Sequence, residues 1–190
     1  MSNEIRFYAA DLAAYNNGIL HGVWINADSD INAMQDEINA MLRKSPCPNV
    51  TVEDPETGKQ VPSAEEWAIH DYEGMPSTFG EYTGLAEIAE YAELAEEHSE
   101  IDEENLCAIV AGFGSVDLAR QALDGNFCGI HNSFKDYARE RADEMLSCYG
   151  KEKEVQWLIE YFDYDAYASD LEMGMNVIDL PDYRVAVFYA

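Results

Sequence analysis

The sequence predicts an α+β protein of three small domains in series, in which two mixed α/β domains flank a helical acidic middle domain. Three observations support this class. Segments rich in β-branched and aromatic residues occur beside segments with helical periodicity. Apolar residues make up 47% of the 190 residues and aromatic residues 12%, whereas disordered acidic chains are poor in both. The charge is concentrated in the middle of the chain. The predicted domains are residues 1–61, 62–104 and 105–190.

The first predicted domain starts with two strands and a helix. Residues 5–10 (IRFYAA) and 18–27 (GILHGVWINA) have strand composition, and Asn16-Asn17-Gly18 predicts a turn between them. A helix from about residue 29 to residue 42 should follow, because serine and aspartate stand at its start and apolar residues recur at helical spacing, at Ile31, Met34, Ile38 and Leu42. Residues 45–62 hold four prolines, which indicates a loop with a short hairpin at the first domain boundary.

The middle domain is predicted to be helical. Residues 64–73 (AEEWAIHDYE) are expected to begin a helical section, and residues 74–84 (GMPSTFGEYTG) break it. Residues 85–98 have the pattern of a clear helix. Its modest apolar stripe consists of Leu85, Ile88, Ala89, Ala92 and Ala95.

The third predicted domain begins with helices and ends with a hairpin. Ser133, with Asp136 three residues later, resembles an N-cap at the head of a helix. The expected helical stretches are residues 102–113, 115–125, 133–149 and 152–172. The expected strands are residues 127–132, then 175–180 and 183–190 as a closing hairpin across Pro181-Asp182.

The net charge of −27 is distributed in blocks. Residues 1–59 hold 9 acidic and 4 basic residues, and residues 60–119 hold 15 acidic residues with no lysine or arginine. Residues 120–153 hold 6 of each, and residues 154–190 hold 8 acidic residues and 1 basic residue. A chain that needed only solubility could distribute this charge evenly. The clustering of acidic residues in one part of the chain therefore indicates a binding surface for a positively charged partner.

Residues 85–105 hold nine carboxylates, or roughly one per 3.5 Å if the whole segment were helical. A DNA strand carries one phosphate per about 3.4 Å. This similarity favours a surface that mimics DNA, although a solvated helix face and the surface of a halophilic protein remain alternatives. The predicted DNA-mimic surface comprises Glu65, Glu66, Asp71, Glu73, Glu81, Glu87, Glu90, Glu93, Glu96, Glu97, Glu100, Asp102, Glu103 and Glu104.

The charge disfavours several kinds of partner, and the N-terminus and the cysteines indicate the compartment. Nucleic acid and anionic membranes are disfavoured, because both require cationic side chains. The N-terminal residues show no signal-peptide pattern, and no apolar run reaches the length of a membrane span. Widely spaced cysteines without a CxxC motif indicate reduced thiols, at Cys47, Cys107, Cys128 and Cys148. We therefore expect a cytoplasmic protein.

Motifs for metal binding or catalysis are not apparent in the sequence. Asp28 begins a segment like an EF-hand loop, but Ala33 and Asn39 stand where glycine and the bidentate glutamate are needed. The four histidines form no HExxH motif or His/Cys cluster, and no phosphate loop or nucleophile motif is present. We therefore predict no metal, no cofactor and no enzymatic activity. An enzyme with an incidental acidic surface is the less favoured alternative.

Three segments resemble the ArdA antirestriction proteins of conjugative plasmids and transposons: residues 8–27 (YAADLAAYNNGILHGVWINA), 65–77 (EEWAIHDYEGMPS) and 125–140 (GNFCGIHNSFKDYARE). The resemblance implies a homodimer of elongated three-domain subunits. It further implies that the protein mimics DNA and binds type I restriction-modification enzymes in its place, chiefly at the methyltransferase core. The main alternative is an acidic module that binds another basic DNA-binding protein, such as a histone-like protein or a transcription factor.

The electrically neutral block, residues 120–153, is the predicted dimer interface. Two subunits of charge −27 repel each other least where the net charge of the approaching surfaces is smallest. The six cations of the block are Arg120, Lys135, Arg139, Arg141, Lys151 and Lys153. The apolar residues expected at the interface are Phe127, Ile130, Phe134 and Tyr137. Alternatively, ion pairs between these six cations and the six acids of the block stabilise the helix within one subunit.

Overall fold

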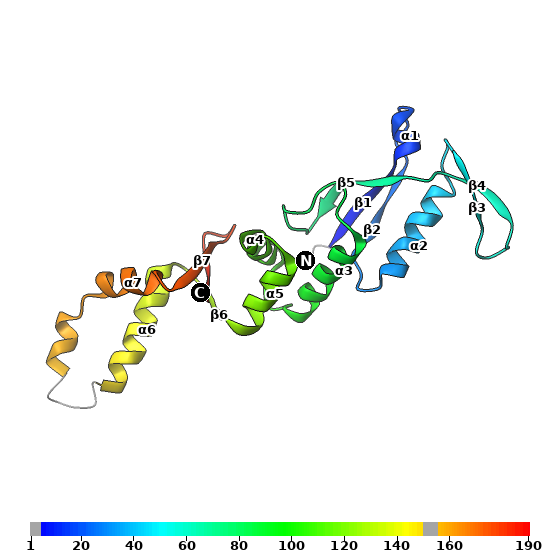
Figure 1. Cartoon of the computed structure of the whole chain (residues 1–190). Helices are drawn as coiled ribbons and strands as arrows, with labels where there is room; N and C mark the ends of the chain where they lie inside the picture. Colours follow the sequence, from blue (N-terminus) through cyan, green and yellow to red (C-terminus); the bar gives the residue numbers. More distant parts are fainter. Residues whose placement is uncertain (1–4, 150–155) are drawn as a thin grey trace. The chain divides into compact units, whose positions relative to one another are not determined.

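A computed structural model describes residues 5–149 and 156–190, and it confirms the α+β class (Figure 1). The chain divides into two compact units, residues 1–107 (unit 1) and residues 108–190 (unit 2). The division falls within α4 (Glu103–Phe113). The arrangement into three domains stays a prediction.

Unit 1 contains an antiparallel sheet in the strand order β2-β1-β5. Phe7 on the central strand lies between Ile25 and Tyr72 of its neighbours, and its side chain is fully buried. The two predicted strands are confirmed, but the connection between them is a short helix in addition to a turn. The four elements are β1 (Arg6–Asp11), α1 (Leu12–Asn16), β2 (Gly22–Asn26) and β5 (Trp67–Glu73).

The prediction of helix for residues 64–73 is wrong, because Trp67–Glu73 forms strand β5. This strand pairs with β1 along its length, from Asp11 opposite Trp67 to Arg6 opposite Glu73. The alanine and glutamates before Trp67 favour a helix locally. The segment from Trp67 nevertheless forms a strand, since strand formation depends on packing against neighbours that lie far away in the sequence.

Helix α2 (Ile31–Leu42) packs against this sheet (Figure 1). Its predicted start is confirmed, because the Asp30 carboxylate accepts hydrogen bonds from the backbone N–H groups of Asn32 and Ala33 at 2.9 and 3.4 Å. The hairpin predicted after α2 is also confirmed, as β3 (Val50–Glu53) and β4 (Gln60–Ser63). The α2 side chains that are buried are Met34, Ile38, Met41 and Leu42.

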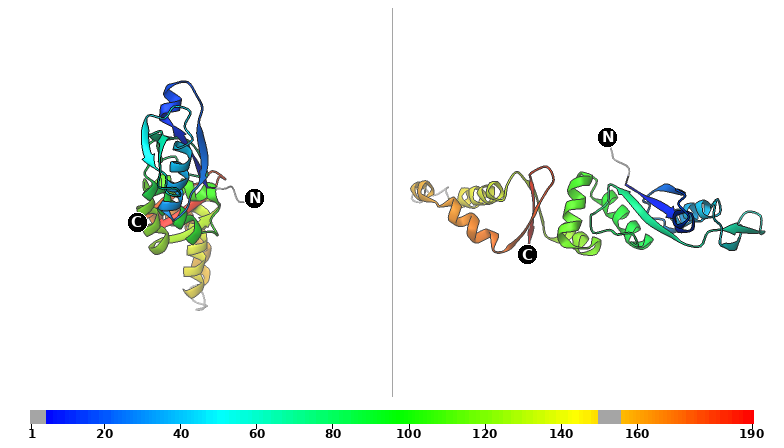
Figure 2. Two further views of the ribbon diagram at one scale, coloured as in Figure 1. Left: turned by 90° about the vertical axis from the view of Figure 1, so that its right-hand side faces the viewer. Right: turned by 90° about the horizontal axis from the view of Figure 1, so that it is seen from above.

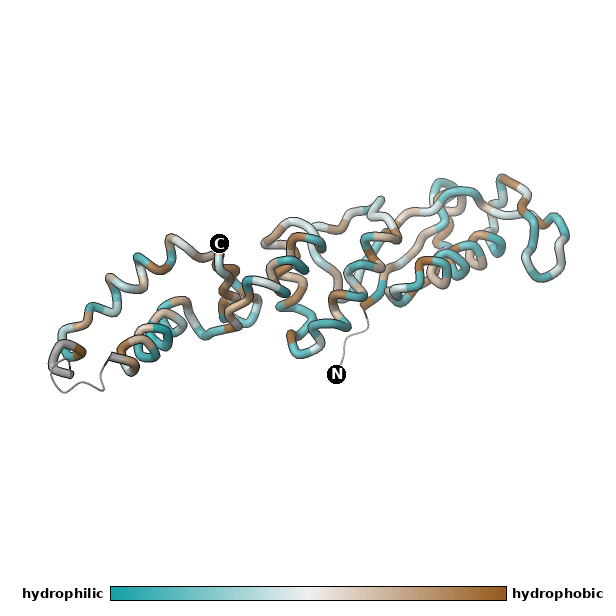
Figure 3. Tube along the Cα trace, turned by 60° about the horizontal axis from the view of Figure 1, so that its bottom comes forward, coloured by the Kyte–Doolittle hydropathy of each residue, from teal (hydrophilic) through white to brown (hydrophobic). Residues whose placement is uncertain are grey.

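Helix α3 (Leu85–Glu97) confirms the helix predicted at residues 85–98, and α4 follows it after a short turn. Hydrophilic and hydrophobic residues alternate along these helices (Figure 3). This alternation lets each helix bury one face and expose the other.

Unit 2 contains a second antiparallel sheet, in the order β6-β8-β7. The helices α6 and α7 lie side by side in two perpendicular views (Figure 1, Figure 2). Phe188 on the central strand is fully buried, with ring centroids 4.9 Å from Phe113 and 5.2 Å from Phe127. The elements are α5 (Val116–Gly125), β6 (Phe127–His131), α6 (Phe134–Tyr149), η1 (Gln156–Tyr161), α7 (Tyr164–Glu172), β7 (Met175–Asp179) and β8 (Val185–Tyr189).

The predictions for the third domain agree with these elements. The helix expected at residues 152–172 corresponds to η1 and α7, and residues 152–155 lie outside the described residues. Lys151 and Lys153 also lie outside them. Within the described residues no single helix is long and apolar enough to cross a membrane; only α4 and α5 taken together, with a bend of 107° between them, meet that criterion.

Candidate protein-binding surface

The acidic helix α3 is fixed in unit 1 by one apolar face. Ile88, Tyr91 and Leu94 are completely buried on this face. The five glutamates of the helix are all exposed: Glu87, Glu90, Glu93, Glu96 and Glu97. Each of the first three glutamates directly precedes one of the buried residues, so a step of about 100° along the helix separates the charged side chain from the core. The helix is thus anchored by its buried apolar side chains while all five carboxylates stay exposed to solvent.

Tyr91 connects α3 to its surroundings beneath the charged surface. Its hydroxyl lies 3.1 Å from the Sγ atom of Cys107 on α4, and its ring meets the Phe79 ring edge-on at 5.8 Å. Burial raises the pKa of the Cys107 thiol to about 11, and burial likewise raises the pKa of Tyr91. Both groups are therefore neutral at physiological pH, so their contact does not bury a charge.

The start of α4 brings carboxylates from different elements together. Asp102 caps the helix, because its carboxylate accepts a hydrogen bond from the backbone N–H of Asn105 at 3.1 Å. The Glu103 carboxylate packs against Gly74, where an added Cβ atom would collide with it. Partial burial raises the pKa of Glu103, and the negative charges of Glu104 and Glu73 raise it further. These acids are therefore close enough to repel one another.

Glu73 has a cationic partner that the sequence did not indicate. The Arg6 guanidinium, which lies over the Trp24 ring at 4.9 Å, forms an ion pair with the Glu73 carboxylate at 2.6 Å. The pair follows from the register of the sheet, in which Arg6 of β1 stands opposite Glu73 of β5. Glu73 therefore contributes less negative charge to the surface than its neighbours do.

All fourteen predicted mimic residues lie in unit 1, where thirteen are exposed and Glu103 is half-buried. We call these fourteen residues the acidic surface. Its residues lie in the segment before β5, in β5, in the loop after β5, in α3, in the turn after α3 and in α4. Residues 1–107 hold 23 acidic and 4 basic residues, for a net charge of −19. Residues 108–190 hold 15 acidic and 7 basic residues, for a net charge of −8.

Two of the four predicted interface residues lie in the core of unit 2. Phe134 is 9% exposed and Tyr137 is 3% exposed, and both pack with Val185 and Val187 of β8. The other two, Phe127 and Ile130, are half-buried on β6, which is an edge strand of the sheet. Only these last two residues retain surface that a second subunit could contact.

Cations of the neutral block make contacts inside unit 2. Lys135 bonds to Asp165 at 2.8 Å, which joins α6 to α7, and Arg141 bonds to Glu144 at 2.7 Å. The guanidinium of Arg139 lies 5.5 Å from the centre of the Tyr164 ring. These contacts match the alternative in which the charges stabilise a single subunit.

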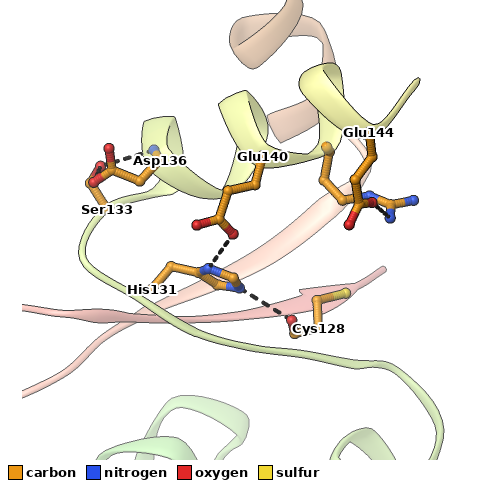
Figure 4. A network of polar contacts seen from close by, with 7 residues as sticks. Cys128, His131, Ser133, Asp136, Glu140 and Glu144 are labelled. Atoms are coloured by element: carbon orange, nitrogen blue, oxygen red, sulfur yellow. Dashed lines mark hydrogen bonds and ion pairs between the residues drawn. The ribbon is translucent and has the colours of Figure 1, made fainter. Parts of the chain in front are cut away.

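His131 connects β6 to α6 (Figure 4). Its Nδ1 atom lies 3.4 Å from a carboxylate oxygen of Glu140, and its Nε2 atom lies 3.2 Å from the backbone oxygen of Cys128. The predicted cap is confirmed nearby, because the backbone N–H of Asp136 donates to the Ser133 hydroxyl at 3.1 Å. Within the described residues, no group of three or more histidine, cysteine, aspartate or glutamate side chains is arranged to hold a metal ion.

Fold and surface together define an acidic protein whose charged side chains are displayed on a packed α+β unit. The family model described as antirestriction protein (ArdA) matches residues 7–182 of the chain. The chain therefore belongs to the ArdA antirestriction family, and the resemblance seen in the three sequence segments is confirmed. No curated protein matches the sequence.

Proposed function

We propose that this antirestriction protein is a DNA mimic, which binds type I restriction-modification enzymes in place of DNA and thereby inhibits them. The observation that supports this proposal best is the exposure of thirteen carboxylates from a region without lysine or arginine, residues 60–119. A groove that binds DNA is lined with lysine and arginine, and a rigid array of carboxylates offers the same charge as phosphates.

The packing of unit 1 supports mimicry more strongly than the charge alone does. A flexible acidic segment loses conformational entropy when a partner orders it, and this loss weakens binding. The buried Ile88, Tyr91 and Leu94 hold the backbone of α3 in place before any partner arrives. The carboxylates of α3 are therefore displayed on an ordered support.

We also propose a docking site on the enzyme, an oligomeric state and a cellular compartment for the protein. The methyltransferase core of the enzyme is the proposed docking site, since it carries the DNA-binding groove. The inhibitor acts as a homodimer in the cytoplasm, it binds without a cofactor and it catalyses no reaction of its own. Unit 2, with the smaller net charge, provides the dimer contact, which leaves the acidic surfaces of both subunits available to the enzyme.

A cleavage-protection assay with charge variants tests this function. Inhibition of a type I enzyme should weaken only slightly when one of Glu87, Glu90 or Glu93 is changed to glutamine, and clearly when all three are changed, because binding is shared among many charges. The matched control changes three exposed acids of unit 2, namely Asp170, Glu172 and Asp179, to their amides. This control changes the net charge by as much as the triple glutamine variant does, and it should inhibit almost as well as the wild type.

Two results would count against the proposal. If a single one of these glutamine substitutions abolished inhibition while the fold persisted, binding would depend on a specific contact and not on a distributed surface. If the triple variant and its unit 2 control lost inhibition to the same extent, total charge and not the acidic surface would determine binding.

A further inference from the structure

An uncharged segment interrupts the acidic unit 1. Residues 12–27 contain no aspartate, glutamate, lysine or arginine, although unit 1 carries a net charge of −19. The segment comprises α1, the turn after it and β2. Its neutrality means that a partner meets a different kind of surface here than on the acidic helix.

Three large apolar side chains of this segment are exposed. Tyr15 is 53% exposed, Ile19 is 41% exposed and Leu20 is 85% exposed. We call these three residues the apolar end of unit 1. Single exposed apolar residues are common on proteins, but three within six positions form a local cluster.

The backbone around the apolar end is held by hydrogen bonds. The Ile19 N–H donates to the Ala14 oxygen at 3.0 Å, and the Asp11 N–H donates to the His21 oxygen at 2.9 Å. Gly18 takes a positive φ of 75° at the turn, a conformation that glycine adopts without strain. Leu20 is thus presented on an ordered turn and not on a frayed end.

Carboxylates stand next to the apolar end. The backbone N–H of Leu12 donates to the backbone oxygen of Glu66 at 3.1 Å, and the Tyr15 ring meets the His70 ring edge-on at 4.7 Å. Glu66, which belongs to the acidic surface and is exposed, therefore lies beside the first residue of α1. A complementary partner therefore carries an apolar side chain surrounded by lysine and arginine.

We infer that the apolar end docks against an apolar site on the same basic, DNA-binding surface of the restriction enzyme that receives the carboxylates. This inference rests on the proposed function. It divides the binding free energy into two parts with different responses to salt. The carboxylate part weakens as salt screens it, whereas the burial of Leu20 and its neighbours does not. The apolar end then supplies the part of the affinity that persists at high salt.

The test measures the affinity of the dimeric full-length protein for the methyltransferase core of a type I enzyme over a range of salt concentrations. Leu20→Ser should weaken binding by about tenfold at every salt concentration, since a leucine side chain loses its burial, and it should leave the salt slope unchanged. Leu20→Met, which stays apolar, should bind like the wild type. The matched control is Met173→Ser in unit 2, where Met173 is 81% exposed, and it should have no effect.

The outcomes separate this inference from the proposed function. If the wild type binds the enzyme and Leu20→Ser binds equally well at every salt concentration, the apolar end has no role and the DNA-mimic proposal stands. If Leu20→Ser changes the salt slope and not the affinity at high salt, the inference is also wrong. If the wild type does not bind the enzyme at all, the proposed function fails, and the inference fails with it.

Discussion

The hydroxyl of Tyr91 lies 3.1 Å from the Sγ atom of Cys107, and this contact joins the acidic helix α3 to α4. Tyr91 is fully buried, while Glu90 and Glu93 on either side of it in the sequence are exposed. The contact therefore lies directly beneath the charged surface. The arrangement indicates that the position of the carboxylates depends on neutral packing beneath them.

Cys107 should react slowly with thiol reagents. Burial raises its pKa to about 11, so only a very small fraction is thiolate at pH 8, and the thiolate is the reactive form. Cys148 is exposed and should react first. Mass spectrometry after timed alkylation with iodoacetamide at pH 8 measures both rates in one sample. Equal rates at the two cysteines would show that α3 and α4 separate readily in solution.

Leu94→Ala should destabilise unit 1 by about 2–5 kcal/mol, because the leucine is completely buried and its truncation leaves a cavity. Glu96→Ala on the exposed side of the same helix should change the free energy of unfolding by less than about 0.5 kcal/mol. Urea unfolding followed by circular dichroism measures both variants. A cost for Leu94→Ala no larger than that for Glu96→Ala would contradict the packing of α3 into the core of unit 1.

Glu103→Gln should stabilise unit 1 at neutral pH. Partial burial, Glu104 and Glu73 raise the pKa of Glu103, so the folded state binds its proton more tightly than the unfolded state does. Stability is then lost as the pH rises through the raised pKa, and it is restored below the usual glutamate value of 4.5. Glutamine does not ionise, so the variant does not lose this stability at neutral pH.

The gain should be small, on the order of 0.5 kcal/mol, because solvent still screens a carboxylate that is only half-buried. Thermal unfolding of Glu103→Gln and the wild type at pH 7 and at pH 4 measures the effect. The variant should unfold at a higher temperature at pH 7, and the difference should shrink at pH 4. Lower stability of the variant at pH 7 would mean that the ionised carboxylate is favoured in the folded state.

The proposed dimerisation should depend on β6, an edge strand of the unit 2 sheet. Ile130→Asp places a charge on a half-buried residue of this edge strand and should shift the protein toward monomers. Tyr183→Asp, at a residue of unit 2 that is 95% exposed, is the control. Phe134→Asp is a poor probe, because Phe134 belongs to the core of one subunit and its substitution should unfold that core.

Sedimentation velocity at low micromolar concentration measures the oligomeric state of both variants. If Ile130→Asp stays folded and dimeric, the interface lies elsewhere. The hairpin strand Val185–Tyr189 is then the next candidate, and Tyr189 is its exposed residue, since Val185 to Phe188 are buried.

Most of the helices and strands could be predicted because their signals are local. The Asp30 cap and the apolar spacing of α2 lie within one short segment, as does the Ser133 cap of α6. Strand β5 could not be predicted in this way, because its partner β1 lies about sixty residues earlier in the chain. The five-residue helix α1 was missed because it is too short for a periodic pattern.

The exposure of the acidic residues was more predictable than the burial of the aromatic residues, for a similar physical reason. Aspartate and glutamate are rarely buried, so the exposure of Glu87 or Glu100 follows from residue type. Aromatic residues can lie in a core or at an interface, and packing against β8 decides in favour of the core for Phe134 and Tyr137. The pairing of Arg6 with Glu73 depends on strand register and has no local signal in the sequence.

Displacement of DNA from a type I restriction-modification enzyme tests the central claim most directly. Fluorescence anisotropy of a labelled duplex that contains the recognition site reports how much DNA stays bound as the protein is added. We predict complete displacement that follows simple competition, with reduced potency for the Glu87, Glu90 and Glu93 triple glutamine variant. Formation of a ternary complex, with the duplex still bound at saturating inhibitor, would contradict DNA mimicry.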